Sequence, residues 1–348
     1  MTLRRHSSIY TILLLSLIAA ILMPVESRAQ GDALLTQYWA LPTYYNPGAV
    51  GDTDNIRLRG AGRMQWVGID NAPKSFVLAA DMPFRLFGKQ RFGTGLVVQQ
   101  ESMGLFRNLS VNAQIGYKRK LFKGELTAAL QIGFFNEQFK GSEVYIPDDD
   151  DFHDPDDEAI PRRDVSGNAI DLGLGLFYTH KKFWAGLSLL HANGATVSFE
   201  NDSETGGSID TGTGGTGTEG GIRKKYQFKA SPTAYFMAGS NIPIKNTLFE
   251  VMPSVLVKSD FTFTTGEITA RCRYNKFLTA GLGYRWNDAV YAVASVEFKG
   301  FYLGYSYDYP TSAIARASSG SHEIFAGYSL KLDLSDKNRH RHKSIRIM

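Results

Sequence analysis

The residues of this chain best suited to chemistry form an acidic run: Asp148–Asp151, Asp154 and Asp156–Glu158. Clustered carboxylate oxygens are ligands that Ca²⁺ prefers. The run lacks the glycine that an EF-hand loop requires, however, and a block of like charges is typical of a solvated surface loop. We favour a surface loop and expect no metal site, and calcium binding stays open as the alternative.

Other candidate motifs fail in their sequence context. Gly212–Gly217 matches the spacing G-x-G-x-x-G, but it follows no buried strand and opens no amphipathic helix, as a dinucleotide-binding loop would. No G-x-S-x-G element occurs, and His180, His191 and His322 have no evident serine and acid partners, so a hydrolase has little support. The single Cys272 excludes an intramolecular disulfide and any cysteine-based metal cluster. We therefore expect no enzyme and no cofactor.

Side-chain polarity alternates with period two along much of the chain. From 277 to 332, four successive segments place apolar side chains on one parity and Gly, polar or charged side chains on the other. In 277–286, for example, Leu278 and Leu282 alternate with Gly281. This pattern predicts strands with one apolar and one polar face, which occur both in soluble sandwiches and in membrane barrels.

Repetition favours the barrel. About fourteen alternating segments follow Ile56, an even number in the range of single-chain outer-membrane barrels, and the 22 Phe and 17 Tyr suit aromatic girdles. We therefore predict an all-β fold, a transmembrane antiparallel β-barrel of about 14 strands with a short N-terminal plug-like segment. The predicted strands are 56–66, 75–82, 92–100, 109–118, 124–137, 170–179, 183–191, 226–242, 248–260, 264–274, 277–286, 289–298, 301–308 and 322–332.

A leader supports export. A basic start precedes the apolar run Ile12–Met23, and Ser27-Arg28-Ala29 resembles a signal-peptidase site. The apolar run is too short to span a bilayer comfortably. We expect four regions: a signal peptide at 1–29, an N-terminal periplasmic or plug segment at 30–55, an outer-membrane barrel at 56–333 and a basic tail at 334–348.

Connector length differs between the two ends of the predicted barrel. The long connectors 138–169, 192–225 and 309–321 all follow odd-numbered strands, whereas the connectors after even-numbered strands are short, and nearly every one carries lysine or arginine. Bacterial barrels have short periplasmic turns and long external loops. A basic periplasmic face could steer an acidic partner protein. The candidate docking residues are Lys181, Lys182, Lys276 and Lys299.

The inward parity carries both signs of charge in near balance, which favours a filled or plugged lumen because opposite charges can pair there. A salt-bridge-lined channel stays open as the alternative. For Arg63, near the end of the first predicted strand, the candidate acid partners are Glu297, Asp308 and Glu323 on the closing strands.

Several motifs together resemble the PorP/SprF family. Arg63-Met64-Gln65-Trp66 followed by Asn71–Ser75 is similar to its R-x-Q-W and A-P elements. Gln37-Tyr38 with Tyr45–Gly48 is similar to its Q-Y and N-P-A entry, with Gly48 where Ala is usual. Gly304–Asp308 and Gly320–Ile324 resemble its closing elements. The family-motif and lumen residues are Arg63, Gln65, Trp66, Pro73, Asp308, His322 and Glu323.

The resemblance implies an outer-membrane component of the type IX secretion and gliding machinery of Bacteroidota. Such a protein would support export or surface anchoring of specific cargo proteins as a non-catalytic scaffold. The implied partners are other type IX secretion components, a periplasmic peptidoglycan-associated protein, a secreted cargo or adhesin, and outer-membrane lipid, with no nucleic acid. The alternative function is a passive porin or FadL-like channel for small solutes.

Overall fold

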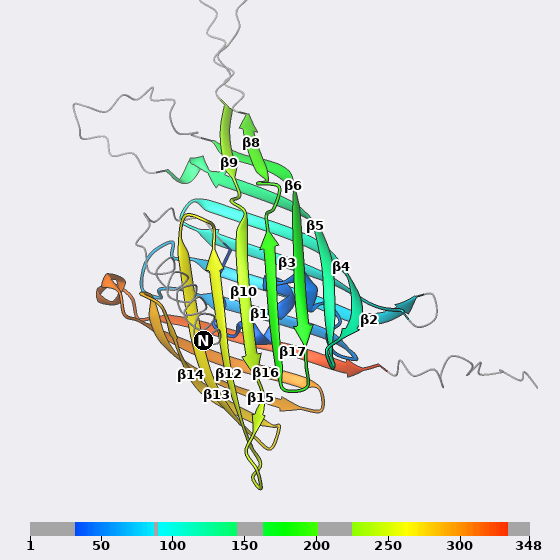
Figure 1. Ribbon diagram of the computed structural model, residues 1–348. Helices are drawn as coiled ribbons and strands as arrows, with labels where there is room; N and C mark the ends of the chain where they lie inside the picture. The colour runs from blue at the N-terminus through cyan, green and yellow to red at the C-terminus, as the bar shows by residue number, and fades with distance from the viewer. Residues whose placement is uncertain (1–31, 87–89, 145–162, 201–224, 333–348) are drawn as a thin grey trace, which may run out of the picture.

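The computed structural model describes residues 32–86, 90–144, 163–200 and 225–332 (Figure 1). The predicted signal peptide, the acidic run, Gly212–Gly217 and the basic tail lie outside these described residues. In the described part of the chain, no helix is both long and apolar enough to cross a membrane.

Fourteen of the described strands form a closed antiparallel ring. Each pairs with the next along the chain, β10 pairs with β12, and β17 pairs with β1 to close the ring. The ring strands are β1 (Asn55–Met64), β2 (Lys74–Leu86), β3 (Gln90–Met103), β4 (Phe106–Leu121), β5 (Gly124–Lys140), β6 (Asp164–Thr179), β7 (Phe183–Leu190), β10 (Thr233–Ser240), β12 (Phe249–Ser259), β13 (Thr264–Tyr274), β14 (Leu278–Arg285), β15 (Ala289–Phe298), β16 (Phe301–Pro310) and β17 (Ser321–Lys331).

The predicted 14-stranded barrel is confirmed, with one correction. The segment 226–242 is not one strand but three pieces: β9 (Lys225–Lys229), β10 and β11 (Ile242–Pro243). Pro232 precedes β10, and a proline has no N–H to donate to a ladder, so the strand breaks there. β9 pairs instead with β8 (Thr196–Glu200) in a two-stranded hairpin outside the ring.

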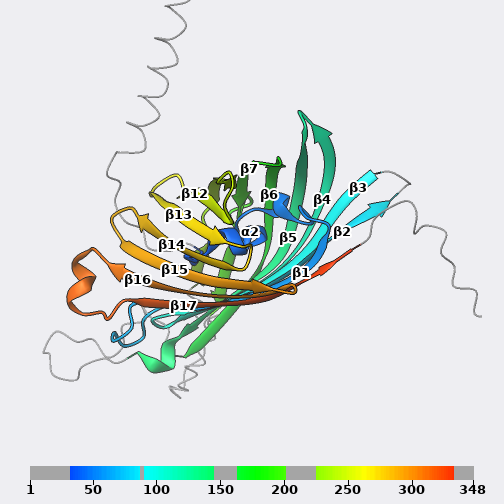
Figure 2. The same cartoon turned by 90° about the horizontal axis from the view of Figure 1, so that it is seen from below.

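The wall is not of even height. β4, β5 and β6 have 16 or 17 residues each, against 8 to 11 for β12–β17, so one side of the barrel extends further (Figure 2). Connectors between consecutive ring strands alternate between the two ends. We call the end with the connector between β5 and β6 the loop end, and the end with the short turns 180–182, 275–277 and 299–300 the turn end.

The two faces of the wall are inverted relative to a soluble sandwich. On β5, Leu130 and Ile132 are 67% and 60% exposed, while Gln131 between them is 5% exposed. Apolar side chains thus face outward around the ring and polar ones face the lumen, which is stable only when lipid surrounds the wall. Exposed aromatic side chains lie toward the strand ends, as in the girdles of outer-membrane barrels: Phe122, Phe183, Phe249, Phe261, Phe277, Trp286, Phe298, Phe301 and Tyr309.

The lumen is occupied by residues 32–54, which we call the plug segment (Figure 2). It contains three single turns of helix: η1 (Tyr38–Ala40), α2 (Pro42–Tyr45) and η2 (Pro47–Ala49). Pro42 and Pro47 start the second and third turns, where their missing N–H groups leave no helical bond unmade. The Asn46 side chain accepts from the N–H of Gly48 and caps the third turn.

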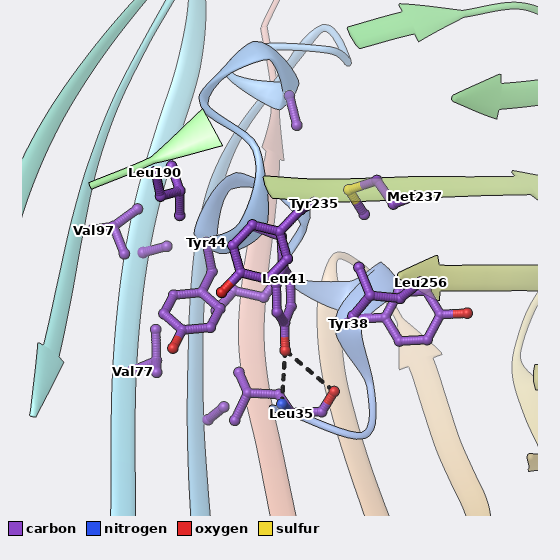
Figure 3. Packing of buried hydrophobic residues seen from close by; sticks show 14 of the residues in the cluster. Leu35, Tyr38, Leu41, Tyr44, Val77, Val97, Leu190, Tyr235, Met237 and Leu256 are labelled. Atoms are coloured by element: carbon purple, nitrogen blue, oxygen red, sulfur yellow. Dashed lines mark hydrogen bonds between the residues drawn. The ribbon is translucent and has the colours of Figure 1, made fainter. Parts of the chain in front are cut away.

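The plug segment supplies the apolar core that a lipid-facing wall cannot. Figure 3 shows its side chains packed against inward-facing residues of several strands. The Tyr45 hydroxyl accepts from the N–H of Leu35 at 2.7 Å, and its ring lies edge-on to Tyr235 with centroids 5.5 Å apart. The buried cluster joins Leu35, Tyr38, Leu41, Tyr44, Tyr45 and Ala49 of the plug with Ala61, Val77, Ala79, Val97, Phe177, Leu190, Tyr235, Met237, Leu256 and Phe325 of the wall.

Two wall glycines make room for the plug. A Cβ on Gly93 would lie 2.2 Å from the carbonyl oxygen of Val50, and one on Gly175 would lie 2.1 Å from Oδ1 of Asn46. Both distances are far below van der Waals contact, so only glycine allows this approach. The plug and the inner surface of the wall therefore have complementary shapes.

Candidate functional site

The charged centre of the lumen is Arg63, at the loop end of β1. Its Nη2 lies 2.8 Å from Oδ2 of Asp308, and its Nη1 lies 3.4 Å from Oε2 of Glu323. The register explains the second contact, because Arg63 lies directly opposite Glu323 on β17. All three side chains are buried. Of the three acids predicted as partners of Arg63, the structure pairs it with two, whereas Glu297 is exposed near the turn end of β15.

The same acids hold the plug. Glu323 accepts the backbone N–H groups of Thr36 and Gln37 at 2.8 and 3.0 Å. The Thr36 hydroxyl donates to Asp308 at 2.8 Å and accepts from Nη1 of Arg63 at 2.7 Å. Three wall residues thus converge on one dipeptide of the plug and bind its two backbone N–H groups and the Thr36 hydroxyl.

Arg285 of β14 extends this cluster. Its guanidinium lies 3.0 Å from Glu267 and 3.1 Å from Asp308, and it also contacts Asp288 at 3.0 Å. Glu267 and Arg285 are neighbours in register on β13 and β14. We call Thr36, Arg63, Glu267, Arg285, Asp308 and Glu323 the central anchor. Two arginines face three buried carboxylates there, and truncating one member would leave another charge buried without a partner.

A second anchor holds the start of the plug. Asp32 contacts Nε2 of His191 at 3.0 Å and accepts from the Tyr235 hydroxyl at 2.7 Å, while Lys258 donates to its backbone carbonyl at 2.7 Å. Burial would raise the pKa of Asp32, but His191 and Lys258 hold it well below its usual range. Burial would lower the pKa of His191, but Asp32 and Asp171, the latter 3.0 Å from Nδ1, raise it to about 10. We call this set the Asp32 anchor.

A third anchor lies at the turn end. Arg57 of β1 contacts Asp52 of the plug at 2.6 Å and Asp81 of β2 at 2.9 Å, and Asp81 also accepts from the N–H of Gly51. Arg91 contacts Asp54 at the same end. The plug segment therefore runs the length of the lumen, from the Asp32 anchor at the loop end to β1 at the turn end.

The family-motif residues divide into two groups. Arg63, Asp308 and Glu323 come together in the central anchor. Gln65, Trp66 and Pro73 instead shape the connector after β1: the N–H of Gln65 donates to the Pro73 carbonyl at 2.9 Å, and that of Trp66 donates to the Ser321 hydroxyl at 3.1 Å.

His322 is a family-motif residue that faces away from the lumen. It lies on the outward parity of β17, where its Nδ1 contacts the Tyr305 hydroxyl at 2.7 Å and its ring lies 5.2 Å from that of Tyr307. The period-two alternation turns it away from the lumen, because its neighbour Glu323 points inward.

The four candidate docking lysines share the turn end. Lys181 and Lys182 lie between β6 and β7, Lys276 between β13 and β14, and Lys299 between β15 and β16, and all four are exposed. They are distributed around the rim rather than gathered in one patch. The structure thus places them on one end of the barrel, as expected from the connector lengths.

Sequence reasoning missed the plug's own anchoring residues, Asp32, Thr36 and Asp52. A signal for a close-packed occupant was present in the inward-facing glycines of strands such as β3 and β6, since Gly in a strand often marks the close approach of another backbone. The pattern does not say which segment approaches.

A ring with an apolar outer face and a buried segment of its own chain in the lumen defines an internally plugged outer-membrane β-barrel. Residues 27–328 match the family described as type IX secretion system membrane protein PorP/SprF. The chain belongs to the PorP/SprF family and is located in the outer membrane.

Similar solved structures include the translocator domain of the autotransporter NalP from Neisseria meningitidis, at 10% identity over 94% of this chain and 96% of that one, with a TM-score of 0.42. The Pseudomonas putida toluene transporter TodX has 12% identity over 86% and 95%, with a TM-score of 0.44. A Pseudomonas aeruginosa FadL homologue has 10% identity over 80% and 90%, with a TM-score of 0.44. These similarities are too distant to bear on function. No curated protein gives a significant match.

Proposed function

We propose that this barrel is a closed, non-catalytic scaffold of type IX secretion that supports export or surface anchoring of specific cargo proteins. The observation that carries the proposal is the plug segment, which is buried in the lumen and anchored along its length. A passive porin would keep an open, water-filled lumen. Here the inward charges pair with one another and with the plug, whereas an ion-selective pore would present rings of one sign.

Single-channel recording in planar bilayers tests closure. The intact protein should give no stable conductance, and a variant lacking residues 32–50 should conduct, because the plug no longer fills the ring. The heat-dependent gel shift shows whether the deletion variant still forms a barrel. If the intact protein conducts as well as the deletion variant, the scaffold proposal fails and the passive channel for small solutes replaces it.

We also propose that the lysine rim at the turn end docks a periplasmic, peptidoglycan-associated partner and other secretion components. Positive charge at one end of the barrel accelerates encounter with an acidic surface, and salt weakens the effect. Reversing Lys181, Lys182, Lys276 and Lys299 to Glu should reduce co-purification of the partner and impair cargo export without unfolding the barrel. The matched control is Lys74→Glu, an exposed lysine at the loop end. Equal loss in the control, or none in the rim variant, would contradict docking at the rim.

A further inference from the structure

A cavity lies at the loop end of the barrel, between the plug segment and the β8–β9 hairpin. Its volume is about 60 Å³, which is room for a group of a few heavy atoms. Asp32 and His191 of the Asp32 anchor line one side, and Phe228 and Lys229 of β9 line another. Inward-facing residues of β3, β4 and β5 supply most of the remaining wall.

Two glutamates face this cavity from one row across the wall. Glu101 of β3 lies opposite Asn108 of β4, and Asn108 lies opposite Glu137 of β5. Neighbouring strands are about 4.8 Å apart, so the two glutamate backbones are separated by about 10 Å. A small group placed over Asn108 is therefore within reach of both carboxylates.

Among the residues that the structure describes, Glu137 has no counter-charge. It is 2% exposed, and its Oε2 has no hydrogen-bond partner among the described residues. Glu101 is better satisfied, since it accepts from the Ser75 hydroxyl at 3.2 Å and from Asn108 at 3.5 Å. A buried carboxylate without a partner is unfavourable, and either a proton or a cation beside it removes the penalty.

The rest of the lining suits an organic cation. The rings of Phe135 and Phe228 stack with centroids 6.0 Å apart, and Phe106 and Met103 add further apolar surface. Aromatic faces attract ammonium groups and also pack against methylene chains. A metal ion is less suited, because no group of three or more His, Cys, Asp or Glu side chains is placed to hold one in the described part of the chain.

We propose that this cavity binds an alkylammonium group, with Glu137 and Glu101 accepting its N–H bonds and the phenylalanine rings enclosing its carbon chain. The group belongs either to a free amine or to a lysine side chain that enters from the loop end. The chain's own Lys229 lines the cavity, but it makes no ion pair with either glutamate in the described structure.

Isothermal titration of the detergent-solubilised full-length protein with n-butylammonium chloride tests the site, with 1-butanol as the neutral probe of the same length. We expect saturable binding of the cation alone, weakened at least tenfold by Glu137→Gln and also weakened by Glu101→Gln. The matched control is Glu250→Gln, an inward-facing carboxylate at the turn end that already pairs with Arg273. The gel shift confirms that each variant is folded.

No saturable binding, equal binding of 1-butanol, or binding unaffected by both cavity variants would overturn the proposal. Lys229→Met provides an independent check. Removing a like charge from the lining should leave butylammonium binding as tight or tighter, whereas loss of binding would mean that Lys229 holds the ligand, which is incompatible with an ammonium site.

Two probes separate the sources of the cation. N-acetyl-lysine methylamide carries the same alkylammonium chain on a peptide-like backbone. If it binds as tightly as butylammonium, the cavity accepts a lysine side chain of another protein. If only butylammonium binds, the ligand is a free amine.

Discussion

At the scale of single residues, buried acids in the lumen bind groups of the wall and groups of the plug at the same time. Glu323 on β17 lies opposite Arg63 on the adjacent strand β1, and it also accepts hydrogen bonds from two backbone N–H groups of the plug. Asp308 joins both arginines of the central anchor to the Thr36 hydroxyl. Substitutions at these positions should therefore disturb ring stability and plug seating at once.

Arg63→Ala should lower the heat resistance of the folded barrel. The substitution leaves Asp308 and Glu323 buried with one cation fewer, and breaking such a pair costs on the order of 3–5 kcal/mol. The measurement is the temperature at which the unboiled gel shift is lost. Arg273→Ala, which removes a more exposed arginine paired with Glu250, is the control and should have a smaller effect. An equal effect of the two would argue against a special role for Arg63.

The Asp32 anchor predicts a dependence on pH. Because the pKa of His191 is raised from 6.5 to about 10, its stabilising charge is fully present below about pH 6.5 and is lost as the pH rises through 10. The lowered pKa of Asp32 has the opposite sense, so its contribution is lost only in acid. We expect the wild-type barrel to lose heat resistance between about pH 7 and pH 10.5.

His191→Gln is the matched variant. It should be less heat-resistant than the wild type near pH 7, and the difference should shrink toward pH 10.5, where His191 is neutral in both the folded and the unfolded chain. A constant difference across this range would show that His191 contributes by packing and not by charge.

At the scale of elements, strand positions follow from the period-two pattern, and most predicted strands lie within a few residues of the observed ones. The exception is the break at Pro232. Because side-chain polarity alternates throughout 226–242, the pattern alone predicts one strand where the structure has β9 and β10. The central anchor was half predictable. The parity of Arg63, Asp308 and Glu323 placed them in the lumen, but Thr36 is 272 residues from Asp308, and no local pattern reports such a contact.

The fit between plug and wall can be tested at a glycine. Gly93→Ala on β3 places a methyl group against the Val50 carbonyl, so the plug must shift or the strand must bend. Overpacking of this kind costs roughly 1–3 kcal/mol. We expect lower heat resistance and a low, intermittent conductance in planar bilayers. Gly62→Ala is the control, since a Cβ there meets no atom within 4 Å. Equal behaviour of the two variants would mean that the plug adapts without strain.

At the scale of the whole molecule, connector length predicts the orientation in the membrane, and cysteine labelling tests it. In a Cys272→Ser background, Thr262→Cys lies in the connector between β12 and β13 at the loop end, and Lys276→Cys lies in a turn at the other end. An impermeant maleimide should label the first on intact cells. It should label the second only after the outer membrane is permeabilised.

The reverse labelling pattern would invert the topology and place the lysine rim outside the cell. It would also remove the basis for docking a periplasmic partner at that rim. Position 262 is exposed in the structure, so failure to label it on intact cells would not reflect burial in the wall.

The plug's place in the chain has a consequence for assembly. Thr36 is among the first described residues, yet its N–H binds Glu323, 287 residues later, on the strand that closes the ring against β1. A slip of β17 by one residue along β1 would turn Glu323 toward lipid and His322 toward the lumen. The plug would then lose its acceptor, and Arg63 would lose an acid partner. We therefore expect the N-terminal segment to favour the correct register of the last strand, which couples completion of the barrel to filling of its lumen.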